Sequence, residues 1–172
     1  MASGTPLLDS PETSHLPNTG PRRSRSRGFL AIAAILVACL GSGLLTSCES
    51  TKPDRDAVIN AVNASRKAAG LAPLVENVTL DIKADNWAQH MRNVCDISHS
   101  VLREGAPANW KKLGENVGRG GTIAVVHDAY MNSPGHRANI LDPAFNQMGA
   151  AAVWGNCKGA RTVFTVHVFM KG

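Results

Sequence analysis

Three polar residues in the middle of this chain carry side chains that could do chemistry. His99 lies in a His-Ser pair, Glu115 in a Gly-Glu-Asn segment and His136 in a Ser-Pro-Gly-His segment. Glycine, proline and asparagine are typical of loops, and polar loop residues are better functional candidates than apolar residues in regular elements. Two imidazoles and one carboxylate are plausible ligands for a divalent ion, Zn²⁺ above all, with water completing the coordination.

The same three residues also have a purely structural interpretation. His99 and His136 are far apart in sequence, so only the tertiary fold could bring them together. Each imidazole could instead donate to a backbone carbonyl, and Glu115 could accept from backbone amides, as polar residues in irregular segments usually do. From the residues alone the structural role is favoured, and the metal site stays open as the alternative.

Catalysis needs more than these residues display. The sequence contains no His-Glu-x-x-His pattern and no Gly-x-Ser-x-Gly elbow. Ser133 is close to His136, but the sequence shows no third group that would orient the histidine, which a serine nucleophile requires. Glu115 could act as a general base on metal-bound water. An enzyme is therefore the minority hypothesis.

The first 47 of the 172 residues have the layout of an export signal. Residues 1–21 are rich in Ser, Thr, Pro and Gly, which predicts disorder. Residues 22–47 place four arginines before an apolar run over 29–40, which is shorter than the ~20 residues of a membrane-spanning helix. Leu45-Thr46-Ser47-Cys48 resembles a bacterial lipobox. We expect lipid on Cys48, although a stray cysteine after a signal peptide is the alternative.

These features predict a protein outside the cytoplasm, anchored to a bacterial membrane through Cys48 or secreted, with residues 48–54 as a tether. If Cys39 leaves with the signal, Cys95 and Cys157 remain as one pair in an oxidising compartment, and we expect a disulfide. Two separate buried thiols are the alternative. The net charge of +5 is dispersed and indicates no nucleic-acid partner. We expect a monomer.

Periodicity divides the rest of the chain into helices first and strands last. It predicts a helix over about 54–69, a helix capped by Thr79, an irregular stretch over 96–121, a helix capped by Thr122, and a hairpin over 147–154 and 161–170. Both faces of the last strand are apolar, so it should be central in a sheet that is covered on both sides. This order predicts an α/β/α sandwich of mixed topology.

Several motifs, taken in their order along the chain, resemble the CAP superfamily of cysteine-rich secretory proteins, antigen 5, plant pathogenesis-related proteins and bacterial SCP-domain proteins. The residues that carry the resemblance are Leu80, Ala84, Trp87-Ala88, His99-Ser100, Gly114-Glu115-Asn116, Tyr130, Ser133-Pro134-Gly135-His136-Arg137, Gly149 and Phe169. The resemblance implies a CAP domain over residues 55–172. Its fold class would be α+β, an α-β-α sandwich with a central, mainly antiparallel sheet.

The resemblance also implies a surface cleft where two histidines and two acidic residues converge. His99, Glu115 and His136 match three of the four positions, and the second glutamate falls on Ser133. The family's links to sterols and fatty acids imply a binding module, for a lipid, a sterol or a divalent metal held by His99 and His136. The alternative is a metal-dependent hydrolase, a peptidase or esterase, with Glu115 as general base.

Overall fold

The structure, a computed structural model, describes residues 7–14 and 50–172. The helices are α1 (Lys52–Ala68), α2 (Val78–Val94), α3 (Ile123–Asn132) and α4 (Pro134–Ile140). The strands are β1 (Leu7–Leu8), β2 (Glu12–Ser14), β3 (Val75–Glu76), β4 (Lys112–Gly120), β5 (Gln147–Cys157) and β6 (Ala160–Lys171). The expected signal segment and the lipidation site Cys48 lie outside the described residues. Within the described ranges, none of the helices is both long and apolar enough to cross a membrane.

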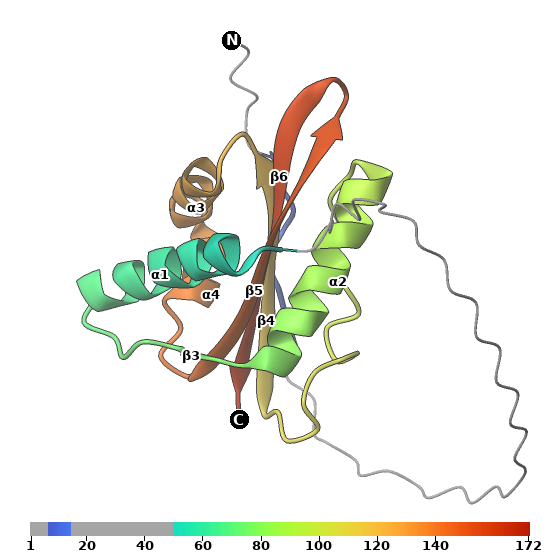
Figure 1. Cartoon of the computed structure of the whole chain (residues 1–172). Coiled ribbons are helices and arrows are strands. Elements are labelled where there is room, and N and C mark those ends of the chain that lie inside the picture. The colour runs from blue at the N-terminus through green and yellow to red at the C-terminus, as the bar shows by residue number, and fades with distance from the viewer. Residues whose placement is uncertain (1–6, 15–49) are drawn as a thin grey trace, which may run out of the picture.

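One mixed sheet forms the middle layer of the molecule. The strand order is β1-β4-β6-β5-β3, with β2 also paired to β4. Only the β3–β5 pair is parallel among the pairs of the described strands. Helix α2 covers one face, and α1, α3 and α4 lie on the other (Figure 1). This confirms the predicted α+β class and the α-β-α sandwich, and the predicted central strand is β6, between β4 and β5.

Two apolar clusters fill the spaces on either side of the sheet. The cluster under α2 includes Leu80, Ala84, Met91, Leu113, Val117, Phe164 and Val166. The cluster under α1, α3 and α4 includes Val58, Val62, Val126, Tyr130, Ile140, Phe145 and Phe169. All buried members of both clusters lie between Val58 and Met170, with Leu8 packed only at a margin. Residues 50–172 therefore carry their own core, and we expect them to fold as a unit.

The two long helices begin at residues that cap them. Thr51 precedes α1 and accepts a hydrogen bond from the backbone N–H of Asp54. The cap of α2 is Asn77, whose side chain accepts from the N–H groups of Thr79 and Leu80, so the predicted cap at Thr79 is wrong. Helix α1 begins inside the range expected to be a tether, and Ser50 is already buried against β5.

The stretch expected to be irregular, residues 96–121, contains the whole of β4, and that prediction is wrong for its last part. The strand was hidden because glycines and polar residues interrupt its alternation. Gly118 is required by close packing, since a Cβ there would lie 2.8 Å from the hydroxyl oxygen of Tyr130. Glu115 and Asn116 are buried because they hold neighbouring segments, as described below.

The disorder expected over residues 1–21 is not what the structure has at residues 7–14. In the structure this segment forms β1 and β2, which pair antiparallel with the outer edge of β4. The remainder of that range is outside the described residues. Because β4 pairs with β6 on its other side, the short strands occupy what is otherwise an open edge of the sheet.

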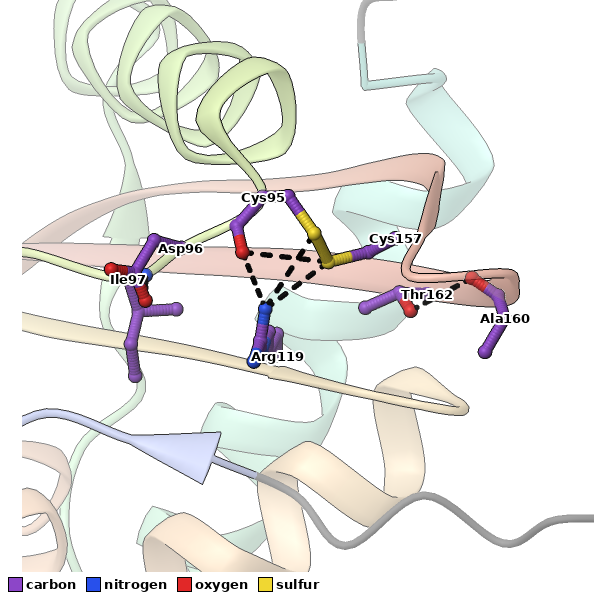
Figure 2. The surroundings of a disulfide bond; sticks show 7 residues. All are labelled: Cys95, Asp96, Ile97, Arg119, Cys157, Ala160 and Thr162. Carbon is purple, nitrogen blue, oxygen red and sulfur yellow. Dashed lines mark hydrogen bonds between the residues drawn. A yellow bond between two sulfur atoms is a disulfide. The ribbon is translucent and has the colours of Figure 1, made fainter.

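The predicted disulfide between Cys95 and Cys157 is confirmed, with the two Cα atoms 5.5 Å apart. It joins the end of α2 to the turn between β5 and β6. Arg119 of β4 points at the bond and donates to the carbonyl of Cys95 at 2.7 Å, as Figure 2 shows. The start of the loop that carries His99 is thus fixed to the sheet by one covalent and one polar contact.

Arg66 of α1 ties the end of α4 to the rest of the domain. The residue is 2% exposed. Nε donates to the carbonyl of Ala72, and Nη1 donates to the carbonyls of Ile140 and Asp142, each at 2.9 Å. Nη2 donates to the carbonyl of Phe145 at 3.5 Å. One planar fork therefore satisfies several carbonyls that would otherwise be buried without partners.

We predict that Arg66→Lys lowers the free energy of unfolding by about 2–4 kcal/mol, because one ammonium group cannot reach all of these carbonyls. Urea unfolding of residues 50–172 followed by circular dichroism measures the change. The exposed neighbour gives the control: Lys67→Arg should stay within about 0.5 kcal/mol of the wild type. Equal stability of the two variants would contradict the role of Arg66.

Candidate functional site

The candidate site lies at the outer edge of β4, where side chains from both faces of the sheet meet. Glu115 points to the α2 face, on which its strand neighbours Leu113 and Val117 join the core cluster. Asn116 points to the opposite face and contacts α4. His99 belongs to the loop after α2, whereas His136 belongs to α4. The two histidines therefore approach the same strand from opposite sides of the sheet.

Glu115 is a fully buried carboxylate whose two oxygens are both engaged. Oε1 accepts from His99 Nδ1 at 2.8 Å and from the backbone N–H of Ser100 at 2.9 Å. Oε2 accepts from the hydroxyl of Ser100 at 2.6 Å. Lys83 of α2 donates to the same hydroxyl oxygen at 2.8 Å. This network compensates the cost of burying the charge and fixes the His99-Ser100 pair on β4.

His99 uses both ring nitrogens as donors. Nδ1 donates to Glu115, and Nε2 donates to the backbone carbonyl of Ser10, which can only accept. Burial alone lowers the pKa of His99, but the hydrogen bonds to Glu115 and Ser10 and the negative charges of Glu115 and Asp9 outweigh it, so the pKa is raised above 6.5. The acceptors at both ring nitrogens thus favour the protonated imidazole.

The surroundings of His136 differ and favour its neutral form. Its Nδ1 makes a 2.7 Å hydrogen bond with the hydroxyl of Ser133, and its side chain is almost fully buried. Burial lowers the pKa of His136; the carbonyl of Asp9 raises it in part, and the charge of His99 lowers it further. The backbone of Asp9 faces the ring as a hydrogen-bond acceptor, but the contact lacks the geometry of a well-formed hydrogen bond, so among the described residues Nε2 of His136 has no such partner.

Two asparagines that the sequence did not nominate dock α4 on β4. Asn116 Nδ2 donates to the carbonyl of His136 at 3.0 Å. Asn139 Nδ2 donates to the side-chain oxygen of Asn116 at 3.0 Å and to the carbonyl of Glu115 at 3.3 Å. Asn116 lies inside the Gly-Glu-Asn motif that suggested the site, and Asn139 follows His136 by three residues, so closeness to the motifs was the available signal. Their contacts are long-range and could not be deduced from spacing.

A buried cluster of aromatic rings packs against His136 in the core. The ring of Tyr130 lies 5.1 Å from that of His136 and 4.9 Å from that of His167 on β6. The Tyr130 hydroxyl is within hydrogen-bond distance, 2.9 Å, of the Thr165 hydroxyl. Burial, and then the nearby His127 and His136, lower the pKa of His167 to about 3. The cluster is fully or almost fully buried, and it was not predicted from the sequence.

The structure thus brings the four predicted cleft residues together as two pairs rather than as one cluster. His99 contacts Glu115, and Ser133 contacts His136. Over residues 7–14 and 50–172, no group of three or more His, Cys, Asp and Glu side chains is arranged to hold a metal ion. Glu115 orients an imidazole here instead of facing open solvent.

Comparison with known proteins agrees with this architecture. The model of the cysteine-rich secretory protein (CAP) family matches residues 59–169. The chain belongs to the CAP family. Over 105 residues it is 35% identical to the uncharacterised protein YkwD of Bacillus subtilis, a match that covers 56% of this chain but only 41% of YkwD. The chain therefore spans less than half the length of that relative.

Solved structures of other bacterial proteins share the fold. An extracellular SCP-domain protein of Bacillus anthracis superposes with a TM-score of 0.60 at 20% identity, covering 76% of this chain and 45% of that one. A cysteine-rich secretory protein of Staphylococcus aureus gives 0.59 at 21% identity, with 74% and 40% covered. An outer surface protein of Borrelia burgdorferi gives 0.59 at 21% identity, with 70% and 94% covered. At these identities the likeness shows the fold alone.

We predict that Glu115→Gln lowers the free energy of unfolding by about 2–4 kcal/mol, because the amide nitrogen cannot accept from Ser100 and the charge-assisted bond to His99 is lost. Urea unfolding gives the magnitude, and NMR of the His99 ring reports its release. The exposed Glu104→Gln is the matched control and should change little. A Glu115→Gln protein as stable as the control would show that the contacts of Glu115 with His99 and Ser100 do not stabilise the fold.

Stability should also fall on acidification through His167. Its folded pKa of about 3 lies below the ordinary value of 6.5, so its contribution is complete above pH 6.5 and is lost as the pH falls towards 3. In His167→Leu this proton uptake on unfolding is absent. The free energy of unfolding should therefore fall less steeply with acidification, by about 1.4 kcal/mol per pH unit between pH 6 and 4. Urea unfolding at four pH values tests this, and parallel curves would contradict it.

Proposed function

We propose that this CAP domain is a non-catalytic binding module that works outside the cytoplasm. Its ligand is held at the pair of imidazoles, His99 and His136, and a divalent cation is the ligand class that these side chains favour. The observation that carries the proposal is the buried Nε2 of His136, which has no hydrogen-bond partner among the described residues. Buried polar atoms are nearly always paired, so this nitrogen is suited to an external ligand.

The hydrogen bonds of the two imidazoles resemble those that orient histidine ligands in metal sites. Each Nδ1 is fixed by a side-chain oxygen, from Glu115 for His99 and from Ser133 for His136. Such contacts orient the ring and direct Nε2 towards a metal. Two protein ligands are fewer than the three or four of ordinary zinc sites, so water would complete the coordination and binding would be weak. Binding at His99 would also require Nε2 to lose its proton and leave Ser10.

Hydrolysis is less well supported by the same contacts. A general base must reach the water that it activates. Glu115 is fully buried, and both of its oxygens already accept hydrogen bonds from His99 and Ser100. Ser133 stands where the family pattern has its second carboxylate. Its hydroxyl contacts His136, but a hydroxyl cannot replace a carboxylate as a general base. We therefore keep the metal-dependent hydrolase as the alternative.

A lipid or sterol has less support than a cation. A cavity of about 450 Å³ lies between α2 and the loop after it, and Ser100 forms part of its wall. Its lining residues are Lys83, Asn86, Trp87, His90, Ser100, Val101, Glu104 and Gly105. The wall of this cavity is more apolar than polar, with Trp87 and Val101 as its large apolar side chains, but it includes neither His99 nor His136. Membrane attachment through a lipid on Cys48 is a separate proposal about the exported chain.

Zn²⁺ titration of residues 50–172 by calorimetry tests the proposal. We predict saturable binding by the wild type and at least a tenfold loss of affinity in His99→Ala and in His136→Ala, since each removes a ligand. Ser133→Ala should weaken binding by about tenfold, because it frees the ring of His136.

His90→Ala is the control, because His90 is an exposed histidine on α2 that stacks on Trp87. Its affinity should equal that of the wild type. Equal heats in the wild type, His99→Ala and His136→Ala would end the cation proposal. Turnover of peptides or esters that Glu115→Gln abolishes would instead establish the hydrolase.

A further inference from the structure

The segment formed by residues 7–14 lies on the candidate site as an added strand. Leu8 is opposite Gly118 and Glu12 is opposite Glu115 in an antiparallel register. Three residues, Asp9 to Pro11, thus face only two residues of β4 between these pairs. The extra residue makes a bulge, and proline is suited to a bulge because it has no N–H to donate.

The bulge is placed between the two histidines. The carbonyl of Ser10 accepts from Nε2 of His99, and the carbonyl of Asp9 acts on His136 from the other side. These are backbone groups, which any extended polypeptide carries. The polar contacts of the imidazoles are therefore with the main chain of the segment, and the carboxylate of Asp9 adds an electrostatic effect on both rings.

Side chains of the segment make three further contacts. Leu8 packs against the core cluster beside Tyr130. Pro11 lies on Gly135, where the three heavy atoms nearest to an added Cβ would all belong to the proline. The hydroxyl of Thr13 donates to Asn139 Oδ1 at 3.0 Å. Residues 7–14 thus make three kinds of contact in sequence: an apolar one, one that requires a glycine, and a polar one.

We propose that the outer edge of β4, between His99 and His136, is a binding site for an extended polypeptide, which residues 7–14 occupy as an internal ligand. Strand addition to an exposed sheet edge is a general way of binding peptides, with main-chain hydrogen bonds giving affinity and alternate side chains giving specificity. The proposal goes beyond cation binding and does not depend on it. If the predicted export signal is removed, residues 7–14 leave with it and the edge becomes open to another chain.

The test uses residues 50–172, which carry both core clusters, and a synthetic peptide of residues 7–14 with blocked ends. Amide NMR shifts on titration should be confined to β4 and the residues around His99 and His136. Gly135→Ala should weaken binding at least tenfold, because its Cβ would overlap Pro11, and it should leave stability unchanged. Gly121→Ala is the matched control, since a Cβ there meets nothing within 4 Å, and it should bind as the wild type does.

A peptide with Leu8→Ser should bind more weakly, and a scrambled peptide should not bind. Lack of saturable binding up to about 2 mM, shifts that fall outside β4, or equal affinity of the wild type and Gly135→Ala would each overturn the proposal. In the full-length chain in detergent, hydrogen exchange of the β4 amides should be faster in Gly135→Ala than in Gly121→Ala, and equal rates would count against pairing within the chain. Zn²⁺ binding that persists while peptide binding fails would leave the proposed function standing.

Discussion

The buried carboxylate of Glu115 is the group on which the arrangement of the site depends. A charge in the interior is costly unless it is paired and hydrogen-bonded, and here His99 and Ser100 supply all the donors. Because these donors come from the loop after α2, the carboxylate joins that loop to the sheet. The disulfide and Arg119 fix the beginning of the same loop. The position of His99 is therefore a consequence of satisfying one buried charge on β4.

The opposite face of the sheet positions His136 by neutral contacts. Asn116 and Asn139 dock α4 on β4, while Arg66 binds the carbonyls that follow the helix. The pKa values of the two histidines thus shift in opposite directions because their surroundings differ. His99 faces a carboxylate, whereas His136 is packed against Tyr130 with a hydroxyl as its partner. The site therefore combines two imidazoles whose pKa values shift in opposite directions with the backbone of an edge strand.

Much of the fold could be predicted from local patterns in the sequence. The stripe of α2, the Thr122 cap of α3 and the apolar faces of β6 each follow from the period of the element and from burial on one or both sides. Strand β4 could not be predicted in this way. Its glycines leave room for aromatic rings from other segments, and its polar residues pair with distant parts of the chain. Asn77 replaced Thr79 as a cap because the helix begins two residues earlier than periodicity indicated.

The sequence by itself therefore determined the helices, the terminal hairpin and the identity of the polar motifs, since these depend on residue type and short spacing. It also indicated the disulfide, because one pair of cysteines remains once the expected export signal is set aside. Only the tertiary structure decided how the motifs meet. It placed His99 and His136 on opposite faces of the sheet, turned both oxygens of Glu115 to structural donors, and laid residues 7–14 along β4. These outcomes depend on which strand edge remains open and on which face each side chain takes. Both are set by long-range pairing, which no local pattern contains.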